Sequence, residues 1–117
     1  MESSLTRTLS LNLAVAAACL LLVPAPALAA EDEIKLVIQD HKFQPTELVV
    51  PSGKKVKLVI ENRDATPEEF ESHALNREKV IAGKSTATIF IGPLKPGRYP
   101  FVGEYNEKTA QGVIVVQ

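Results

Sequence analysis

Residues 55–62, which read Lys-Val-Lys-Leu-Val-Ile-Glu-Asn, decide the fold class of this chain. Apolar side chains recur there at every second position, at Val56, Leu58 and Ile60, and the charged side chains fall on the opposite face. An alternation with a period of two is typical of a β-strand that buries one face and exposes the other. The stretch is therefore predicted to be a core strand.

The chain on both sides of this strand carries the same kind of signal. Short runs of β-branched residues are separated by turns such as Pro51-Ser52-Gly53 and Pro96-Gly97, and no long segment has helical periodicity. An all-β sandwich with one modest core follows. Further strands are predicted at residues 34–39, 47–50, 85–91, 98–105 and 111–117. The aromatic side chains are expected to be core or plug residues rather than ligands: Phe43, Phe70, Phe90, Tyr99, Phe101 and Tyr105.

One long interval between the predicted strands, from Asn62 to Ser85, has no clear strand pattern. Within it, Thr66 is suited to cap a helix, and Pro67 is suited to the first helical position. Glu69 would complete a capping box, so we predict a short helical turn that continues to Ser72. Long loops on a β scaffold often carry function.

The N-terminal segment has the features of a secretory signal peptide. Arg7 precedes an apolar run over residues 11–23, and Ala27 and Ala29 fit the small positions of a cleavage signal. The run is shorter than the roughly 20 apolar residues of a spanning helix. We predict a signal peptide at residues 1–29 and an exported domain at residues 30–117, periplasmic or otherwise outside the cytoplasm, with no membrane insertion after cleavage.

Charge and sulfur content exclude several functions for the predicted mature domain. Removal of residues 1–29 takes away Glu2 and Arg7, so the formal net charge stays at −1 and gives no basic surface for nucleic acid. The single cysteine is Cys19 and the single methionine is Met1. The mature domain therefore has no disulfide and no sulfur ligand for a soft metal.

Five short motifs give the chain a resemblance to cupredoxin domains. Phe43-Gln44-Pro45, Val50-Pro51-Ser52-Gly53 and residues 58–64, which end in Asn62-Arg63-Asp64, resemble the opening F-x-P, V-P-x-G and N-x-D pattern of that family. Residues 96–101 resemble the P-G-x-Y-x-F approach to the copper loop, and residues 112–116 resemble the strand that follows it. The resemblance implies a cupredoxin-like Greek-key β-sandwich.

The same resemblance implies that no blue-copper centre is present. Such a centre takes two histidines, a cysteine thiolate and usually a methionine. At the corresponding places this chain has Glu68 for the first histidine, Gly103 near the cysteine, Asn106 near the second histidine and Ala110 near the methionine. Blue-copper electron transfer is therefore not expected.

Carboxylates are concentrated in the two regions where those ligands would lie. Glu68, Glu69, Glu71 and Glu78 come from the long interval, and Glu104 and Glu107 come from the region before the last strand. Carboxylate oxygens with a nearby imidazole such as His73 suit iron, manganese or cupric copper. The candidate metal ligands are Glu68, Glu69, Glu71, Glu78, Glu104 and His73, and the expected ion is iron or copper.

The segments Pro67–Ser72 and Leu75–Val80 also resemble a cupredoxin-like subgroup associated with periplasmic ferrous-iron uptake in bacteria. That resemblance implies a membrane iron permease, or another periplasmic uptake component, as partner. It also implies a role in delivering iron or in assisting the oxidation of ferrous iron.

Two interpretations of the acidic residues are open at this point. The glutamates could converge on a metal, or they could complement a helix N-terminus and pair with neighbouring cations. In the second case the domain would be a metal-free interaction module. Because the chain has no nucleophile motif and no phosphate-binding glycine loop, we do not expect it to be an enzyme by itself.

Overall fold

The computed structural model describes residues 32–117, together with the isolated residues Ala18 and Leu21. The predicted signal peptide, Cys19 and the expected cleavage point lie outside the continuous described range. Within the described residues, no helix is long and apolar enough to cross a membrane.

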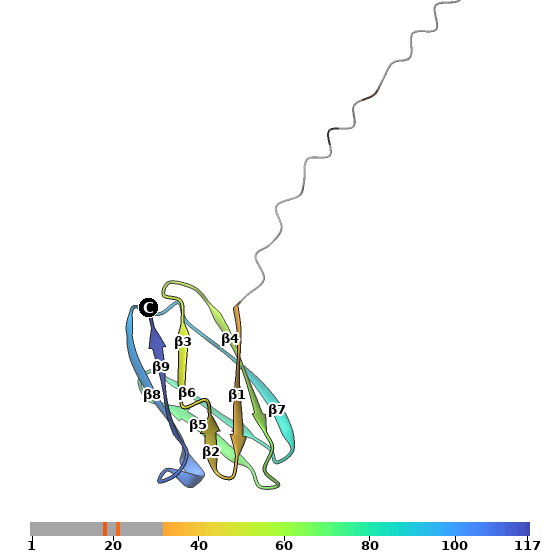
Figure 1. Ribbon diagram of the computed structural model, residues 1–117, viewed down its shortest axis with the longest axis vertical. Helices are drawn as coiled ribbons and strands as arrows, with labels where there is room; N and C mark the ends of the chain where they lie inside the picture. Colours follow the sequence, from red (N-terminus) through yellow and green to blue (C-terminus); the bar gives the residue numbers. More distant parts are fainter. Residues whose placement is uncertain (1–17, 19–20, 22–31) are drawn as a thin grey trace, which may run out of the picture.

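Residues 32–117 form two packed β-sheets, so the predicted all-β sandwich is confirmed (Figure 1). One sheet has the strand order β2-β1-β4-β7 and the other β3-β9-β8-β5-β6. The first sheet contains β1 (Asp32–Gln39), β2 (Lys42–Gln44), β4 (Val56–Asn62) and β7 (Ser85–Ile91). The second contains β3 (Glu47–Val50), β5 (Glu68–Ser72), β6 (Arg77–Ile81), β8 (Gly97–Gly103) and β9 (Gln111–Val116).

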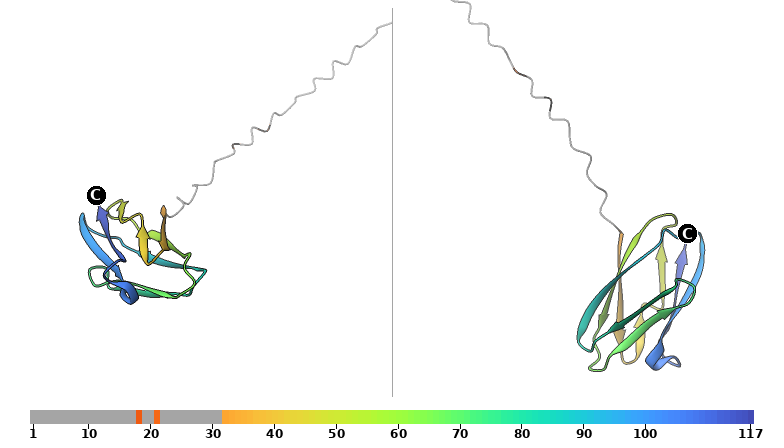
Figure 2. Two further views of the ribbon diagram at one scale, coloured as in Figure 1. Left: turned by 60° about the horizontal axis from the view of Figure 1, so that its bottom comes forward. Right: turned by 180° about the vertical axis from the view of Figure 1, so that it is seen from behind.

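The connections take the chain back and forth between the two sheets (Figure 2). Three pairs, β1–β2, β5–β6 and β8–β9, are antiparallel neighbours within one sheet, whereas the other connections cross from sheet to sheet. Strand β4 lies in the first sheet between β1, with which it is parallel, and β7, with which it is antiparallel. Strand β3 pairs in parallel with β9 at the edge of the second sheet.

The core lies between the sheets and is built from the alternating positions that the sequence indicates. In β4 the predicted residues Val56, Leu58 and Ile60 are all buried. The burial of such side chains, each worth roughly 1.5–3 kcal/mol relative to exposure, is the main contribution that stabilises the sandwich. The strands therefore owe their positions mainly to a period-two pattern of apolar residues.

The prediction that aromatic residues fill the core is only partly confirmed. The rings of Phe43, Phe70 and Phe101 are buried and contact one another, with centroids 4.9 Å apart for Phe43–Phe101 and 5.0 Å for Phe70–Phe101. Phe90 and Tyr105 are 41% and 52% exposed, so neither lies in the core. Phe90 lies on the outer face of β7, where the ammonium of a lysine covers its ring.

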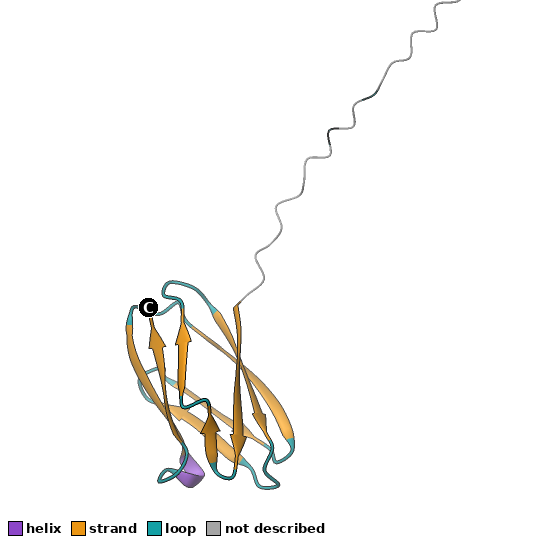
Figure 3. Cartoon of the chain, viewed as in Figure 1, coloured by secondary structure: helices purple, strands orange, loops and turns teal. Residues whose placement is uncertain are grey.

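The predicted helical turn at residues 66–72 is wrong. Residues Glu68–Ser72 form strand β5, which pairs with β6 in an antiparallel hairpin. Strand β5 pairs with β6 and β8, and its Phe70 side chain is buried against Phe43 and Phe101. These tertiary contacts favour the extended conformation and override the local capping pattern. The only helical turn in residues 32–117 is the short 3-10 turn η1 (Glu104–Asn106) that follows β8 (Figure 3).

Candidate functional site

Strand β5 distributes its acidic side chains over two faces. Burial alternates along the strand, so that Glu68, Phe70 and Ser72 point into the sandwich while Glu69 and Glu71 are only partly buried on the outer face. Successive side chains of a β-strand must point to opposite faces. Glu68 is therefore separated from Glu69 and Glu71, although the three are close in sequence.

The neighbouring strands bring two more glutamates to the outer face of β5. Glu71 is paired with Glu78 of β6 on one side and with Val102 of β8 on the other. Glu104 follows two residues after Val102 and returns to the same face. One carboxylate oxygen from each of Glu69, Glu78 and Glu104 lies within 4.8 Å of the others. We call these three residues the outer carboxylate group.

The carboxyl of Glu71, next to the outer carboxylate group, perturbs the titration of Glu104. A hydrogen bond with the Glu71 carboxyl, and the charge of that carboxyl, raise the pKa of Glu104. Burial raises the pKa of Tyr105, and the charge of Glu69 raises it further. A raised carboxyl pKa means that the negative form is disfavoured, so a cation bound here would relieve the repulsion.

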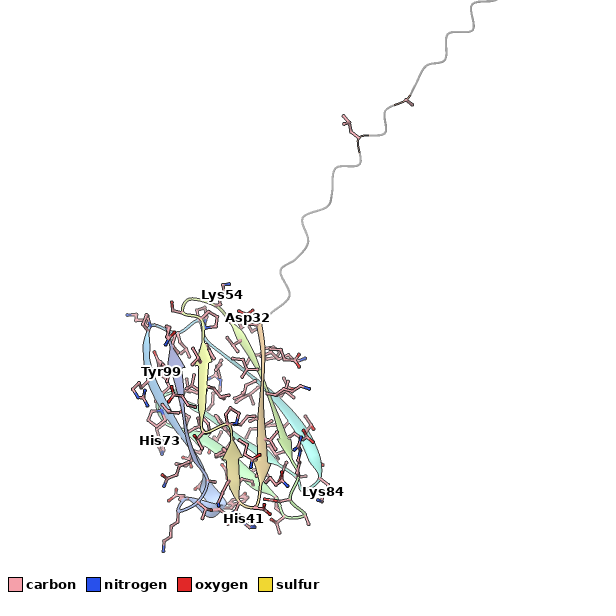
Figure 4. The ribbon with its side chains drawn as sticks, in the orientation of Figure 1. Asp32, His41, Lys54, His73, Lys84 and Tyr99 are labelled. Carbon is pink, nitrogen blue, oxygen red and sulfur yellow. The ribbon has the colours of Figure 1, made fainter. Side chains whose placement is uncertain are left out.

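Glu71 and His73 lie beside the outer carboxylate group. The imidazole Nε2 of His73 is 3.2 Å from Oε1 of Glu71, and the His73 side chain is almost fully exposed. A hollow of about 410 Å³ opens there, lined by Glu71, Ser72, His73, Asn76, Arg77 and Glu78. Glu78 belongs to the group and also lines the hollow, so the imidazole of His73 is available next to the carboxylates. The other histidine, His41, lies at the β1–β2 turn, well apart from His73 (Figure 4).

Glu68 is the predicted ligand that the structure does not bring to the others. Its side chain is buried, with 2% of its surface exposed. Its Oε1 accepts hydrogen bonds from the backbone N–H groups of Glu69, at 3.0 Å, and Tyr105, at 2.9 Å. Its Oε2 accepts one from the Asn106 Nδ2 at 2.7 Å. The carboxylate is thus fully engaged inside the protein.

The four positions that correspond to blue-copper ligands do meet in space. Asn106 contacts Glu68 as described, and the Gly103 N–H donates to the Ala110 carbonyl at 2.9 Å. A Cβ atom on Gly103 would lie only 2.7 Å from both the Ala110 Cβ and the Glu68 Cδ. The Glu68 carboxylate therefore occupies the space among these positions. Since residues 32–117 contain no cysteine and no methionine, a blue-copper centre does not fit.

Sequence reasoning missed the contribution of the 3-10 turn that follows β8. Tyr105 supplies a backbone donor and Asn106 a side-chain donor to Glu68, and Tyr105 also places a half-exposed phenol beside the outer carboxylate group. The signal for the backbone contact is absent from the sequence, because any residue has a backbone N–H. The alternation within Glu68–Ser72 is the signal that could have shown which glutamates share a face.

Comparisons with known proteins agree with this fold. The family model described as a cupredoxin-like domain matches residues 12–116. An uncharacterized protein of Rickettsia prowazekii (strain Madrid E) is 48% identical over 84 residues, which cover 72% of this chain and 67% of that protein.

Two solved structures show the same fold at low sequence identity. Auracyanin A, a "blue" copper protein from Chloroflexus aurantiacus, has a TM-score of 0.61 at 18% identity, with 73% of this chain and 98% of that chain covered. The metal-binding domain of the Cu(I)-exporting P-type ATPase of Streptococcus pneumoniae D39 has a TM-score of 0.62 at 15% identity, with 73% and 84% covered. The match of the family model over most of the chain, together with the sandwich itself, shows that this chain belongs to the cupredoxin-like domain family.

Proposed function

We propose that this chain is a periplasmic metal-binding protein that serves iron uptake and binds its ion through the outer carboxylate group. The observation that carries the proposal is the convergence of Glu69, Glu78 and Glu104, which come from β5, β6 and η1, with one oxygen of each within 4.8 Å. Three negative groups held this close repel one another unless a cation is bound.

The chemistry of the donors is compatible with iron. Carboxylate oxygens are the ligands that hard ions prefer, and a neutral imidazole extends the range to borderline ions such as Fe²⁺ and Cu²⁺. Glu71 and His73 stand next to the group and are the candidates to complete the coordination. Cupric copper is the second choice, since Auracyanin A, which shares the fold, is a "blue" copper protein. Cuprous copper is disfavoured because the domain offers no sulfur.

The biological role in this proposal is the supply of iron to a membrane iron permease. It is supported by the predicted signal peptide at residues 1–29 and by the resemblance of Pro67–Ser72 and Leu75–Val80 to a subgroup associated with ferrous-iron uptake. The ion is cargo in this role. Assistance in oxidation would require a partner that accepts the one electron lost by Fe²⁺.

The test is a calorimetric titration of the purified protein with Fe²⁺ under anaerobic conditions, with Fe³⁺ supplied as a weak chelate, and with Cu²⁺ and Mn²⁺. We expect saturable binding of iron with one ion per chain. In a Glu69→Gln, Glu104→Gln double variant the affinity should fall about tenfold or more, because two charged ligands are lost from the coordination shell.

Glu107→Gln is the matched control. Glu107 lies in the same loop as Glu104 and is exposed, but it is not a member of the outer carboxylate group, so the loss of one negative charge there should leave binding nearly intact. Absence of saturable binding with all four ions would contradict the proposal. The metal-free alternative, in which the acidic face contacts a cationic partner, would then be preferred.

A further inference from the structure

Glu68 is a buried carboxylate that no part of the proposed ion binding uses. An ionised carboxylate inside a protein is unfavourable unless it is paired or fully hydrogen-bonded. Here three donors surround it: the N–H groups of Glu69 and Tyr105 and the side-chain amide of Asn106. In the described part of the chain, no buried side-chain nitrogen or oxygen lacks a hydrogen-bond partner. Glu68 is thus held in one place.

The donors come from the two segments that carry members of the outer carboxylate group. Glu69 itself belongs to the group, and Tyr105 directly follows Glu104. The ladder between β5 and β8 pairs Phe70 with Gly103 and Glu71 with Val102, and it does not extend to Glu104. The Glu68 carboxylate therefore fastens the chain to β5 just where the strand pairing has ended.

The space for this contact is provided by Gly103. A Cβ there would lie 2.7 Å from the Glu68 Cδ and 2.9 Å from its Oε2, so only glycine lets the carboxylate pass to the Tyr105 N–H. The chain after Gly103 then turns outward and places Glu104 on the outer face. The buried side chain of Glu68 thereby holds the backbone at Glu69 and at Tyr105, next to two members of the outer carboxylate group.

We infer that Glu68 is a positioning residue of the ion site, which holds Glu104 against Glu69 through the backbone of Tyr105 and the side chain of Asn106, and that it is not itself a ligand. The expected effect on the affinity for the ion rests on the proposed function. The structural part of the inference, the anchoring of residues 104–106, stands independently of any ion.

A pair of substitutions separates a positioning role from a ligand role. In Glu68→Gln the Oε1 atom can still accept from both backbone N–H groups, and Asn106 can turn its amide to accept from the new NH₂. In Glu68→Leu both acceptor atoms are lost. We expect Glu68→Gln to bind Fe³⁺ within about threefold of the wild type, and Glu68→Leu to bind about 10- to 100-fold more weakly, as is typical when support of a metal ligand is removed.

The second readout needs no metal. Amide hydrogen exchange measured by NMR on the ion-free protein should show that the Tyr105 N–H loses protection in Glu68→Leu and keeps most of it in Glu68→Gln. Ile60→Val, a truncation in the core of the other sheet, is the control for a general loss of stability, and it should leave both the Tyr105 protection and the affinity nearly unchanged relative to the wild type. Should Glu68→Leu fail to fold, Asn106→Ala removes one of the three bonds and is expected to weaken iron binding by several-fold.

The outcomes are distinguishable. Equal losses of affinity in Glu68→Gln and Glu68→Leu would indicate that Glu68 is a ligand and would overturn the inference. Wild-type affinity in Glu68→Leu would also overturn it. Where Glu68→Leu does not fold, wild-type affinity in Asn106→Ala would overturn it instead. If the wild type binds no ion, the proposed function is wrong. In that case the hydrogen-exchange protection of the Tyr105 N–H still tests the anchoring of residues 104–106. Unchanged protection in Glu68→Leu, or in Asn106→Ala as its substitute, overturns the anchoring, whereas a loss of protection supports it.

Discussion

The neighbours of Gly103 leave no room for a side chain at this position. The position that a Cβ would take lies 2.7 Å from the Ala110 Cβ, inside the closest approach of two carbon atoms. The other close neighbour, the Glu68 carboxylate, cannot move away without the loss of its hydrogen bonds to Tyr105 and Asn106. A single methyl group at residue 103 therefore disturbs two contacts at once.

We predict that Gly103→Ala lowers the free energy of unfolding by about 1–3 kcal/mol, the usual cost of overpacking a core. Urea denaturation followed by circular dichroism measures it. A Gly103→Ala, Ala110→Gly double variant removes one of the two clashes and should recover part of the loss. Stability of Gly103→Ala equal to that of the wild type would contradict the close packing of Glu68 against this position.

Glu68 also shows the limit of prediction at the level of single residues. Its position was identified from the sequence as the place where a cupredoxin has its first histidine, and the structure does bring it to Gly103, Asn106 and Ala110. Its direction could not be predicted, because it depends on whether the segment is a helix or a strand. The hydrogen bonds that Glu68 accepts from backbone N–H groups could not be predicted either, because every residue except proline has such a group.

At the scale of elements, the strands that the sequence indicates are those with an apolar face. The predicted strands at residues 47–50 and 85–91 agree with β3 and β7, and 55–62 differs from β4 by one residue. Each has two or more apolar side chains that face the core. The period-two pattern and the turns that contain glycine or proline were sufficient for them.

The β5–β6 hairpin was missed because its signals are polar. In β5 two of the three inward side chains, Glu68 and Ser72, are hydrophilic, so the alternation is invisible to a search for apolar residues. In β6 only the last residue, Ile81, is buried. What makes these segments strands is pairing with β8 and with each other, which is a tertiary effect.

The turn between β1 and β2 allows a prediction about pH. The carboxylate of Asp64, after β4, accepts the backbone N–H of Asp40 at 2.8 Å and that of His41 at 3.0 Å. These bonds, above all that from His41, lower the pKa of Asp64 below its ordinary value of 3.8. The carboxylate form is thus stabilised by folding, and the stability that it contributes is present above that value and lost as the pH falls through the lower pKa of the folded state.

Asp64→Asn should therefore destabilise the domain at neutral pH, by less than about 1 kcal/mol because solvent screens this partly exposed group. The difference between variant and wild type should shrink as the pH is lowered below 3.8. Thermal denaturation at a series of pH values measures it, with Asp32→Asn at the start of β1 as a control for the loss of one charge. A difference that stays constant down to low pH would rule out the carboxylate form as the source.

At the scale of the whole molecule, the core and the outer carboxylate group have opposite effects on stability. The core is one continuous cluster that includes residues of both sheets, such as Leu36, Ile60, Phe70 and Ile114. Repulsion within the outer carboxylate group opposes it. We expect the ion-free domain to remain folded, because the core does not depend on the group, but to gain stability when an ion is bound.

A bound ion should raise the free energy of unfolding by about 2.7 kcal/mol at a free concentration 100 times the dissociation constant. Scanning calorimetry with and without Fe³⁺ measures the shift in Tm, and addition of a chelator should reverse it. In the Glu69→Gln, Glu104→Gln variant, whose affinity is expected to be at least tenfold weaker, the stabilisation at the same ion concentration should fall to about half or less, and it should persist in Glu107→Gln. Unfolding of the wild type on addition of chelator alone would show that the ion is needed for folding itself, against our expectation.

The position of β6 at the edge of its sheet has a consequence for self-association of the protein. An edge strand offers unpaired backbone groups to any other extended chain, and such pairing is a common route to aggregation. In β6 the exposed residues Arg77, Glu78 and Lys79 alternate in sign, so a strand that approaches must desolvate charges before it can pair. The edge strand that carries Glu78 thus also discourages a second copy of the chain from adding to the sheet.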